Sequence, residues 1–251
     1  MTFYDLSKEE RGKLIQKIHS EILAELQSGK KREIEKYFSD EDTYIRKAGY
    51  LAVGKIYMAE SSLREKVILL LDTMMKSDDA KIRQTVVNSA GEIGISDFRV
   101  VEKFFHQGLL DEHHSVRNAV IGSVKKMGEK NPKPVLAFAK QYLHHEDKEV
   151  RREICHGIEL RGRTHPEDIL PLLKVLEFDR TSRVRNTLVH VLGQIAYKKG
   201  CLEKVIAHLK TWKNTEVVKE AIDEILDVHI RYKNFSCKTH SEAKKYVDAN
   251  F

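Results

Sequence analysis

Apolar and small residues recur at helical spacing in several segments of the chain, each opening with a Val-Arg or Ile-Arg pair. Around Arg117, the residues at offsets −1, +3, +6, +7 and +10 are Val116, Val120, Ser123, Val124 and Met127. This period of about 3.6 residues predicts an amphipathic helix. We expect six such helices, called B helices here, over residues 43–58, 80–94, 114–128, 148–161, 182–198 and 216–229.

The basic residue near the start of each B helix is almost periodic. Arg46, Arg83, Arg117, Arg151 and Arg185 are separated by 37, 34, 34 and 34 residues, and Lys219 follows after another 34. Such a period is typical of a stacked repeat. Shorter apolar segments lie between the B helices and predict a second helix in each repeat, called the A helix. Pro132 and Pro166 fit the first turn of two A helices.

Two helices per repeat and no strand pattern predict an all-α fold, a right-handed α-α superhelix of about six two-helix repeats. We expect a single domain over residues 1–251. It would consist of an N-terminal cap over 1–28, repeats over 29–229 and a C-terminal cap over 230–251. Gly94, Gly128 and Gly162 each follow an arginine by 11 residues and are predicted to be helix C-caps.

Aspartates accompany the periodic arginines at offsets of −6 or −4. An Asp before a helix can accept backbone N–H groups or pair with an arginine. The alternative is a basic stripe for phosphates, but the acids would neutralise it. We therefore expect an inter-repeat network that stabilises the stack. Its members are Asp79, Arg83, Asp111, Arg117, Asp147, Arg151, Asp179 and Arg185.

The chain resembles the HEAT repeat over roughly residues 30–229. The resemblance rests on an Asp, a short gap and then a Val-Arg pair at the start of the second helix, as in EDKEVRREICHGIEL from Glu146. The resemblance implies a HEAT-like α-solenoid whose B helices line a concave groove.

More distantly, the chain is similar to HEAT-like DNA alkylation repair glycosylases in size, in basic charge and in segments such as KKMGEKNPKPVLAFAKQYL. That family implies tryptophans framing a damaged nucleotide, whereas the only tryptophan here, Trp212, is expected in the core.

Offsets +1, +5 and +8 of each B helix are expected on the exposed wall of this groove. Arg and His there can donate charge-assisted bonds to a phosphate or carboxylate, whereas solvated groups without a dedicated ligand are the alternative. The candidate binding residues are Asn88, Asn118, Lys125, Arg152, His156, Glu159, Asn186 and His190.

Metal binding has weaker support in the sequence. Repeat stacking would place His156 beside His190, with Glu159 and Cys155 nearby. Because no known ligand spacing appears, we predict no metal and no cofactor.

Composition narrows the function only slightly. Lysine and arginine number 44 against 38 acids, a formal charge of +6 that permits an anionic partner. Three cysteines without a CxxC favour a reducing, cytoplasmic location. No apolar run is long enough to span a membrane, and no catalytic motif is found.

The sequence therefore favours a non-catalytic binding scaffold for a protein or peptide, acting as a monomer. A protein that binds duplex DNA and acts in alkylation repair is the alternative, and this alternative leaves open whether the chain is an enzyme.

Overall fold

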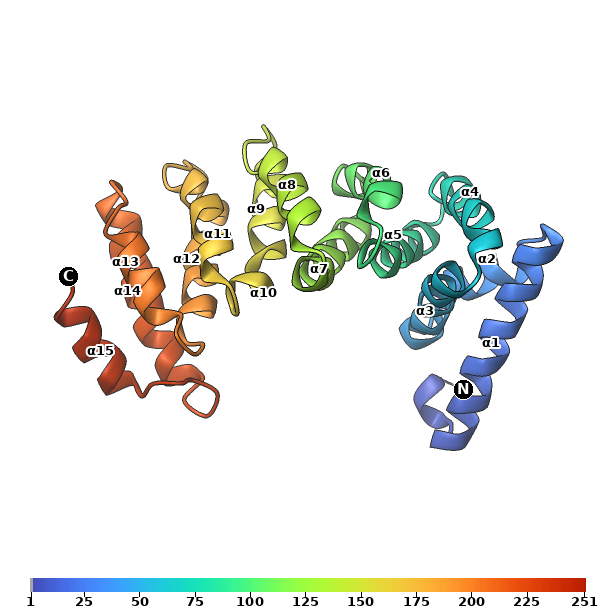
Figure 1. The fold of residues 1–251 in the computed structure, drawn as a ribbon, viewed down its shortest axis with the longest axis horizontal. Helices are drawn as coiled ribbons and strands as arrows, with labels where there is room; N and C mark the ends of the chain where they lie inside the picture. Colours follow the sequence, from blue (N-terminus) through green and yellow to red (C-terminus); the bar gives the residue numbers. More distant parts are fainter. Residues whose placement is uncertain (1) are drawn as a thin grey trace. The chain divides into compact units, whose positions relative to one another are not determined.

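The computed structural model describes residues 2–251, which form helices and their connections without a strand. The chain divides into two compact units, Met1–Asn131 and Pro132–Phe251 (Figure 1). A single repeat domain across both units stays a prediction. None of the helices over residues 2–251 is both long and apolar enough to cross a bilayer.

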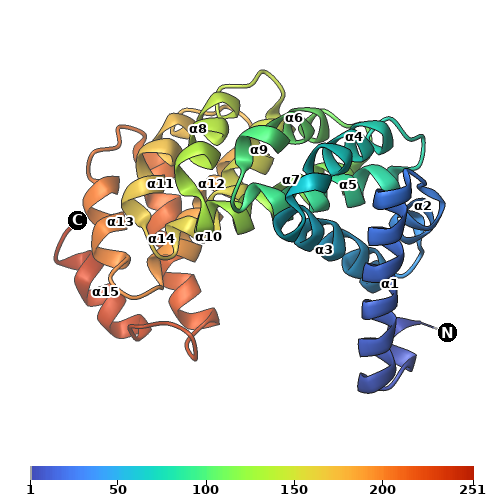
Figure 2. The same ribbon diagram turned by 45° about the vertical axis from the view of Figure 1, so that its right-hand side comes forward.

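The first unit contains one terminal helix and three helix pairs. Its elements are η1 (Phe3–Asp5), α1 (Lys8–Ser28), α2 (Arg32–Ser39), α3 (Thr43–Ala59), η2 (Ser61–Leu63), α4 (Arg64–Met74), α5 (Ala80–Gly94), α6 (Phe98–Leu109) and α7 (His114–Lys130). The B helices α3, α5 and α7 pack side by side, with α1 against α3. The A helices α4 and α6 lie on one side of α5 and α7 (Figure 2). Phe38, Phe104 and Phe105 are fully buried between these layers.

The second unit repeats this arrangement. Its elements are α8 (Pro132–Tyr142), α9 (Lys148–Gly157), α10 (Glu159–Gly162), α11 (Pro166–Leu173), η3 (Lys174–Leu176), α12 (Ser182–Ala196), α13 (Leu202–Leu209), α14 (Thr215–Arg231) and α15 (His240–Asp248). The B layer consists of α9 with α10, then α12 and α14, and α15 covers the end of α14. The predicted all-α solenoid fold is confirmed.

One predicted B helix differs from the structure. Residues 148–161 were expected to form one helix, but the helix ends at Gly157 and a short helix begins again at Glu159. Ile158 lies between them with φ −87° and ψ −5°, where the regular turn is lost. Glu159 is therefore the first residue of the short second helix.

Aspartates at offset −4 begin the B helices. The carboxylates of Asp42, Asp79 and Asp147 accept the backbone N–H groups of Tyr44, Lys81 and Glu149, each at 2.8 Å. These bonds satisfy donors that have no partner within the first helical turn. In these three repeats the −4 position is thus a helix cap.

Aspartates at offset −6 have a different role in two repeats. Asp111 accepts hydrogen bonds from Arg83 of the preceding repeat, with 2.7 Å from Nε to Oδ2 and 3.0 Å from Nη2 to Oδ1. Asp179 is held in the same way by Arg151, 28 residues earlier, at 2.6 and 3.2 Å. Burial opposes ionisation of Asp111, but the bonds from Arg83 hold the pKa of this carboxyl below its ordinary value.

The other two arginines of the predicted network make different contacts. Arg117 Nη1 donates to the backbone carbonyls of Asp111 and Glu112 at 2.7 and 2.9 Å. Arg185 lies near the carboxylates of Glu220 and Glu216, at 3.3 and 3.5 Å. The reason lies in the sequence, because the position 28 residues after Arg117 or Arg185 is not an aspartate but His145 or Lys213.

The prediction that Gly94, Gly128 and Gly162 are helix C-caps was wrong, because the caps are Ile95, Asn131 and Arg163. Among the described residues, only Gly29 and Gly200 are glycines with positive φ. A Cβ on Gly94 would collide with Met127 of α7, and one on Gly162 would collide with Ile195 of α12. At these two positions glycine allows neighbouring B helices to approach closely.

Candidate binding surfaces

The predicted groove residues at offsets +1 and +5 are accessible to solvent. Asn118 and Asn186 are exposed, and Asn88 is half-buried, as are Arg152, His156 and His190. They lie on both units, with Asn88 and Asn118 in the first and the others in the second. The B helices of each unit therefore carry part of the predicted set.

Offset +8 was also predicted to lie on the exposed wall, but four of its six positions are buried, whereas Asp227 is exposed. Gly54, Gly91 and Gly193 are buried, and an added Cβ on each would press against the next B helix at Glu92, Ser123 or Glu224. Glu159 occupies the same offset and is only 2% exposed. Lys125 is half-buried. In a stacked repeat this offset faces the neighbouring helix, which a helical wheel of one segment cannot show.

Charged side chains on the B-helix face of the second unit are largely engaged with one another. Arg152 Nε donates to Glu149 at 2.8 Å and its Nη2 lies 3.4 Å from the buried Glu153. On α14, Arg231 donates to Glu224 at 2.6 Å. Arg152, predicted to bind an anionic ligand, is therefore already neutralised within its own unit.

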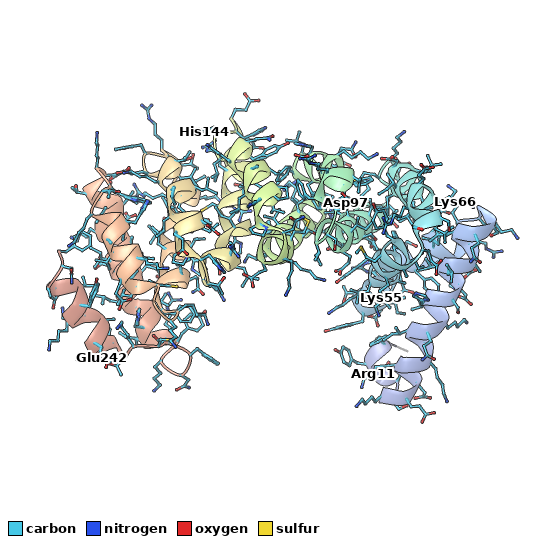
Figure 3. All side chains as sticks on the ribbon, viewed as in Figure 1. Arg11, Lys55, Lys66, Asp97, His144 and Glu242 are labelled. Atoms are coloured by element: carbon cyan, nitrogen blue, oxygen red, sulfur yellow. The ribbon has the colours of Figure 1, made fainter. Side chains whose placement is uncertain are left out.

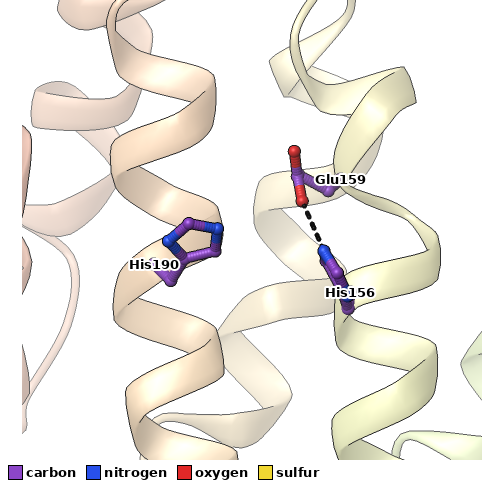
Figure 4. A group of neighbouring side chains, drawn as sticks. All are labelled: His156, Glu159 and His190. Atoms are coloured by element: carbon purple, nitrogen blue, oxygen red, sulfur yellow. Dashed lines mark ion pairs between the residues drawn. The ribbon is translucent and has the colours of Figure 1, made fainter. Parts of the chain in front are cut away.

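Two histidines and one glutamate gather near the break between α9 and α10 (Figure 4). His156 Nε2 lies 3.1 Å from Glu159 Oε2. The ring of His190, on α12, has its centroid 6.3 Å from that of His156 at an interplanar angle of 73°. Arg163 Nη2 donates to the second oxygen of Glu159. This cluster joins the broken B helix to the next one.

A pocket of about 550 Å³ lies in the first unit between η1, α1 and α3. Its aromatic side chains are Phe3, Tyr4 and Tyr44, whose rings contact one another. Phe3 stacks on Tyr44 with centroids 5.8 Å apart, and Tyr4 meets Tyr44 edge to face at 4.4 Å. Tyr4 and Tyr44 remain 59% and 40% exposed. Ile15, Leu51 and Ala52 complete the apolar lining.

A backbone contact fixes the aromatic segment to the B layer. The carboxylate of Asp42 accepts the N–H of Phe3 at 2.6 Å as well as that of Tyr44 at 2.8 Å. One aspartate thus caps α3 and holds η1 over the start of that helix. The pocket is formed by residues about 40 positions apart, which explains why the sequence pattern did not reveal it.

The rim of this pocket is basic. Lys47 and Lys55 are exposed on α3 and line the pocket (Figure 3 labels Lys55). Within residues 2–251 neither ammonium group forms an ion pair or hydrogen bond. Arg11 lies over the Tyr4 ring, with its guanidinium carbon 5.1 Å from the centroid. The pocket therefore combines exposed aromatic surface with positive charge.

Two other tyrosines, at the ends of α3 and α12, do not provide such a surface. Tyr57 and Tyr197 are each 4% exposed. Trp212 is buried, and its Nε1–H donates to His208 at 2.9 Å. The role of Trp212 as a core residue matches the sequence prediction.

Residues 135–226 match the family of HEAT repeats. Among solved structures, AlkD2 from Streptococcus mutans is similar, with a TM-score of 0.57, 19% identity, and coverage of 76% of this chain and 94% of that chain. The protein smu.31 from Streptococcus mutans UA159 has a TM-score of 0.53, 20% identity, and coverage of 68% and 89%. No curated protein sequence matches. The family match identifies HEAT repeats over residues 135–226, and the two solved structures confirm the HEAT-like solenoid fold.

Proposed function

We propose that this chain is a non-catalytic HEAT-like scaffold whose first unit binds an acidic segment of a protein partner in the aromatic pocket. The observation that carries this proposal is the pair of exposed lysines, Lys47 and Lys55, on the rim of a pocket lined by Phe3, Tyr4 and Tyr44. An apolar side chain of the partner would enter the pocket, and flanking carboxylates would contact the lysines.

The energetics favour a partner that carries both features. Burying exposed aromatic surface contributes roughly 25 cal/mol per Å² removed from water. Exposed ion pairs add little, about 0.2–1 kcal/mol each, but positive charge excludes basic competitors and speeds association. We therefore expect the pocket to supply affinity and the lysines to supply selectivity for acidic segments.

A fluorescence anisotropy titration tests this function. The probe is a labelled peptide in which one phenylalanine is flanked on both sides by glutamates. We expect Lys47→Glu with Lys55→Glu to weaken binding about tenfold, which corresponds to about 1.4 kcal/mol. Raising the salt concentration should weaken wild-type binding, because the charges at the rim are exposed to solvent.

The matched control is Lys199→Glu with Lys233→Glu. Both lysines are exposed in the second unit, and the change in net charge is the same. This control should bind the peptide as the wild type does. Equal weakening of peptide binding in both double variants would show that only the net charge of the protein affects affinity. That result would overturn the assignment of the pocket as the binding site. Equal binding of a peptide with lysines in place of the glutamates would also overturn the proposal.

The second candidate function is DNA alkylation repair. The fold likeness to AlkD2 and the formal charge of +6 favour this alternative. A base-excision assay on methylated duplex DNA tests it, with release of the modified base as the supporting result. A gel shift over a salt series would show duplex binding separately, since phosphate contacts weaken steeply with salt. If neither assay is positive, this candidate falls.

A further inference from the structure

Glu159 occupies a position at which other repeats have glycine. It lies at offset +8 of its B helix, where Gly54, Gly91 and Gly193 allow the next B helix to approach. The carboxylate is 2% exposed. It directly follows the break at Ile158, and α10 begins at Glu159 itself. A buried carboxylate is costly unless cations or hydrogen bonds compensate it.

Its two oxygens have different surroundings. Arg163 Nη2 donates to Oε1, whereas Oε2 lies 3.1 Å from His156 Nε2. The ring of His190 approaches from α12 (Figure 4). One ligand atom from each of His156, Glu159 and His190 lies within 4.8 Å of the other two. These atoms can converge on one point after small changes in side-chain torsion angles.

The donor set is typical of a transition metal. Two imidazoles and one carboxylate suit Zn²⁺ and related first-row ions, whereas Mg²⁺ and Ca²⁺ prefer oxygen ligands. A three-ligand zinc site keeps its fourth position for water or another ligand. The histidine side chains are 35% and 43% exposed, so solvent can reach this position.

Outer groups are arranged to orient the ligands. His190 Nδ1 lies 3.5 Å from Glu224 Oε1, which leaves Nε2 for a metal. Glu224 is itself fixed by Arg231 at 2.6 Å. Arg163 can stay on Oε1 of Glu159 while Oε2 turns to the ion. Metal-bound histidines usually donate their other N–H to such a carboxylate or carbonyl group.

We propose that His156, Glu159 and His190 bind one divalent transition ion of the zinc type and that this ion connects the broken B helix to α12. The site is independent of the peptide pocket, since all three ligands belong to the second unit. The ion replaces the His156–Glu159 contact as the partner of the buried carboxylate. It thereby stabilises the stack at the point where the regular helix is interrupted.

The test is isothermal titration of tag-free, chelator-treated full-length protein with Zn²⁺, together with a thermal melt at each metal concentration. We expect one equivalent to bind and the melting temperature to rise with Zn²⁺ but not with Mg²⁺, because only the folded state holds the site. Co²⁺ in place of Zn²⁺ should give the visible absorption of a four-coordinate ion.

His190→Ala is the principal variant because this half-buried side chain can be removed without burying an unpaired charge. It should lose the stoichiometric binding and the Zn²⁺-dependent melting shift while melting like the metal-free wild type. Glu224→Gln should weaken binding about tenfold through loss of an outer-shell partner. His113→Ala with His114→Ala removes two neighbouring histidines of the first unit and should leave binding intact.

Two outcomes would overturn the site. One is the absence of stoichiometric binding, which would leave Glu159 with an ion-pair role only. The other is binding that persists in His190→Ala and disappears in the His113/His114 control. His156→Gln supplies a second ligand test, since that side chain is half-exposed. Loss of binding in this folded variant supports the site, whereas unchanged binding overturns it.

Discussion

The B-helix faces of the two units differ in whether the cationic side chains named here are free in solvent or paired with carboxylates. In the first unit, Lys47 and Lys55 extend into solvent beside an aromatic pocket. In the second, Arg152, Arg185 and Arg231 all contact carboxylates of their own unit. Arg152 is paired with acids of its own helix α9, Arg231 with acids of its own helix α14, and Arg185 with acids of the next helix. A repeat period alone thus does not define a binding surface, because nearby acids on the same helix or the next one decide which charges remain available.

The largest effect should come from removing an arginine of the buried pairs. Arg151 and Asp179 have side chains 16% and 6% exposed, whereas Arg185 is 33% and its partner Glu216 is 69% exposed. We expect Arg151→Met to lower the free energy of unfolding by about 3 kcal/mol, because it strands a buried carboxylate. Arg185→Met should cost less than about 1 kcal/mol.

Urea unfolding followed by the fluorescence of Trp212 measures both variants in the second unit. Equal losses would show that burial does not separate the two arginines. A binding defect without loss of stability in Arg151→Met would contradict its structural role.

Acid should reveal the same buried pairs. Burial opposes ionisation of Asp179, but bonds from Arg151 and from the backbone of Thr181 hold its pKa below the ordinary value. The stabilisation that ionised Asp179 contributes to folding is therefore present above its unfolded-state pKa of about 3.9. It is lost as the pH falls through the lower pKa of Asp179 in the folded state. We expect Arg151→Met with Asp179→Asn to be less stable at neutral pH and to lose less stability on acidification. An unchanged acid dependence of Trp212 fluorescence would refute this assignment.

Neutralising the acids of α14 should make the second unit more like the first. Glu220→Gln with Glu224→Gln leaves Arg185 and Arg231 with fewer carboxylate neighbours. We expect the acidic peptide probe to bind this variant a few-fold more tightly, since each released cation can contribute about 0.2–1 kcal/mol. Anisotropy measures the change. If the affinity for the peptide stays the same, pairing with the acids of α14 is not what prevents Arg185 and Arg231 from binding an acidic partner.

The smallest effect concerns Gly122 on α7. This glycine is exposed, and an added Cβ would meet nothing within 4 Å. Gly122→Ala should stabilise the first unit by about 0.5–1 kcal/mol through helix propensity. Gly91→Ala should instead destabilise it, because the new methyl would press on Ser123 of the next helix. Thermal melts of the two variants provide the comparison.

The periodic pattern was sufficient to predict the helix pairs and the capping aspartates. It could also have separated the two kinds of arginine, since an Asp 28 residues later is visible in the sequence for Arg83 and Arg151 but absent for Arg117 and Arg185. The break at Ile158 was missed because no proline marks it. Burial at offset +8 was missed because it depends on the distance to the next helix.

The aromatic pocket and the histidine–glutamate cluster illustrate the same limit. Phe3 and Tyr44 are brought together by a long-range contact through Asp42. The repeat spacing predicted that His156 and His190 lie close together, but the buried state of Glu159 required the structure. Local periodicity therefore predicts elements well and predicts sites only where neighbouring repeats contribute equivalent positions.

Hydrogen–deuterium exchange of the full chain, with and without the glutamate-flanked phenylalanine peptide, tests the central claim most directly. Binding at the pocket predicts added protection in the segments around η1 and the first turns of α3, with α12 and α14 unchanged. Protection confined to α12 and α14, or no change around η1 and α3 at saturating peptide, would contradict the assignment of the binding function to the first unit.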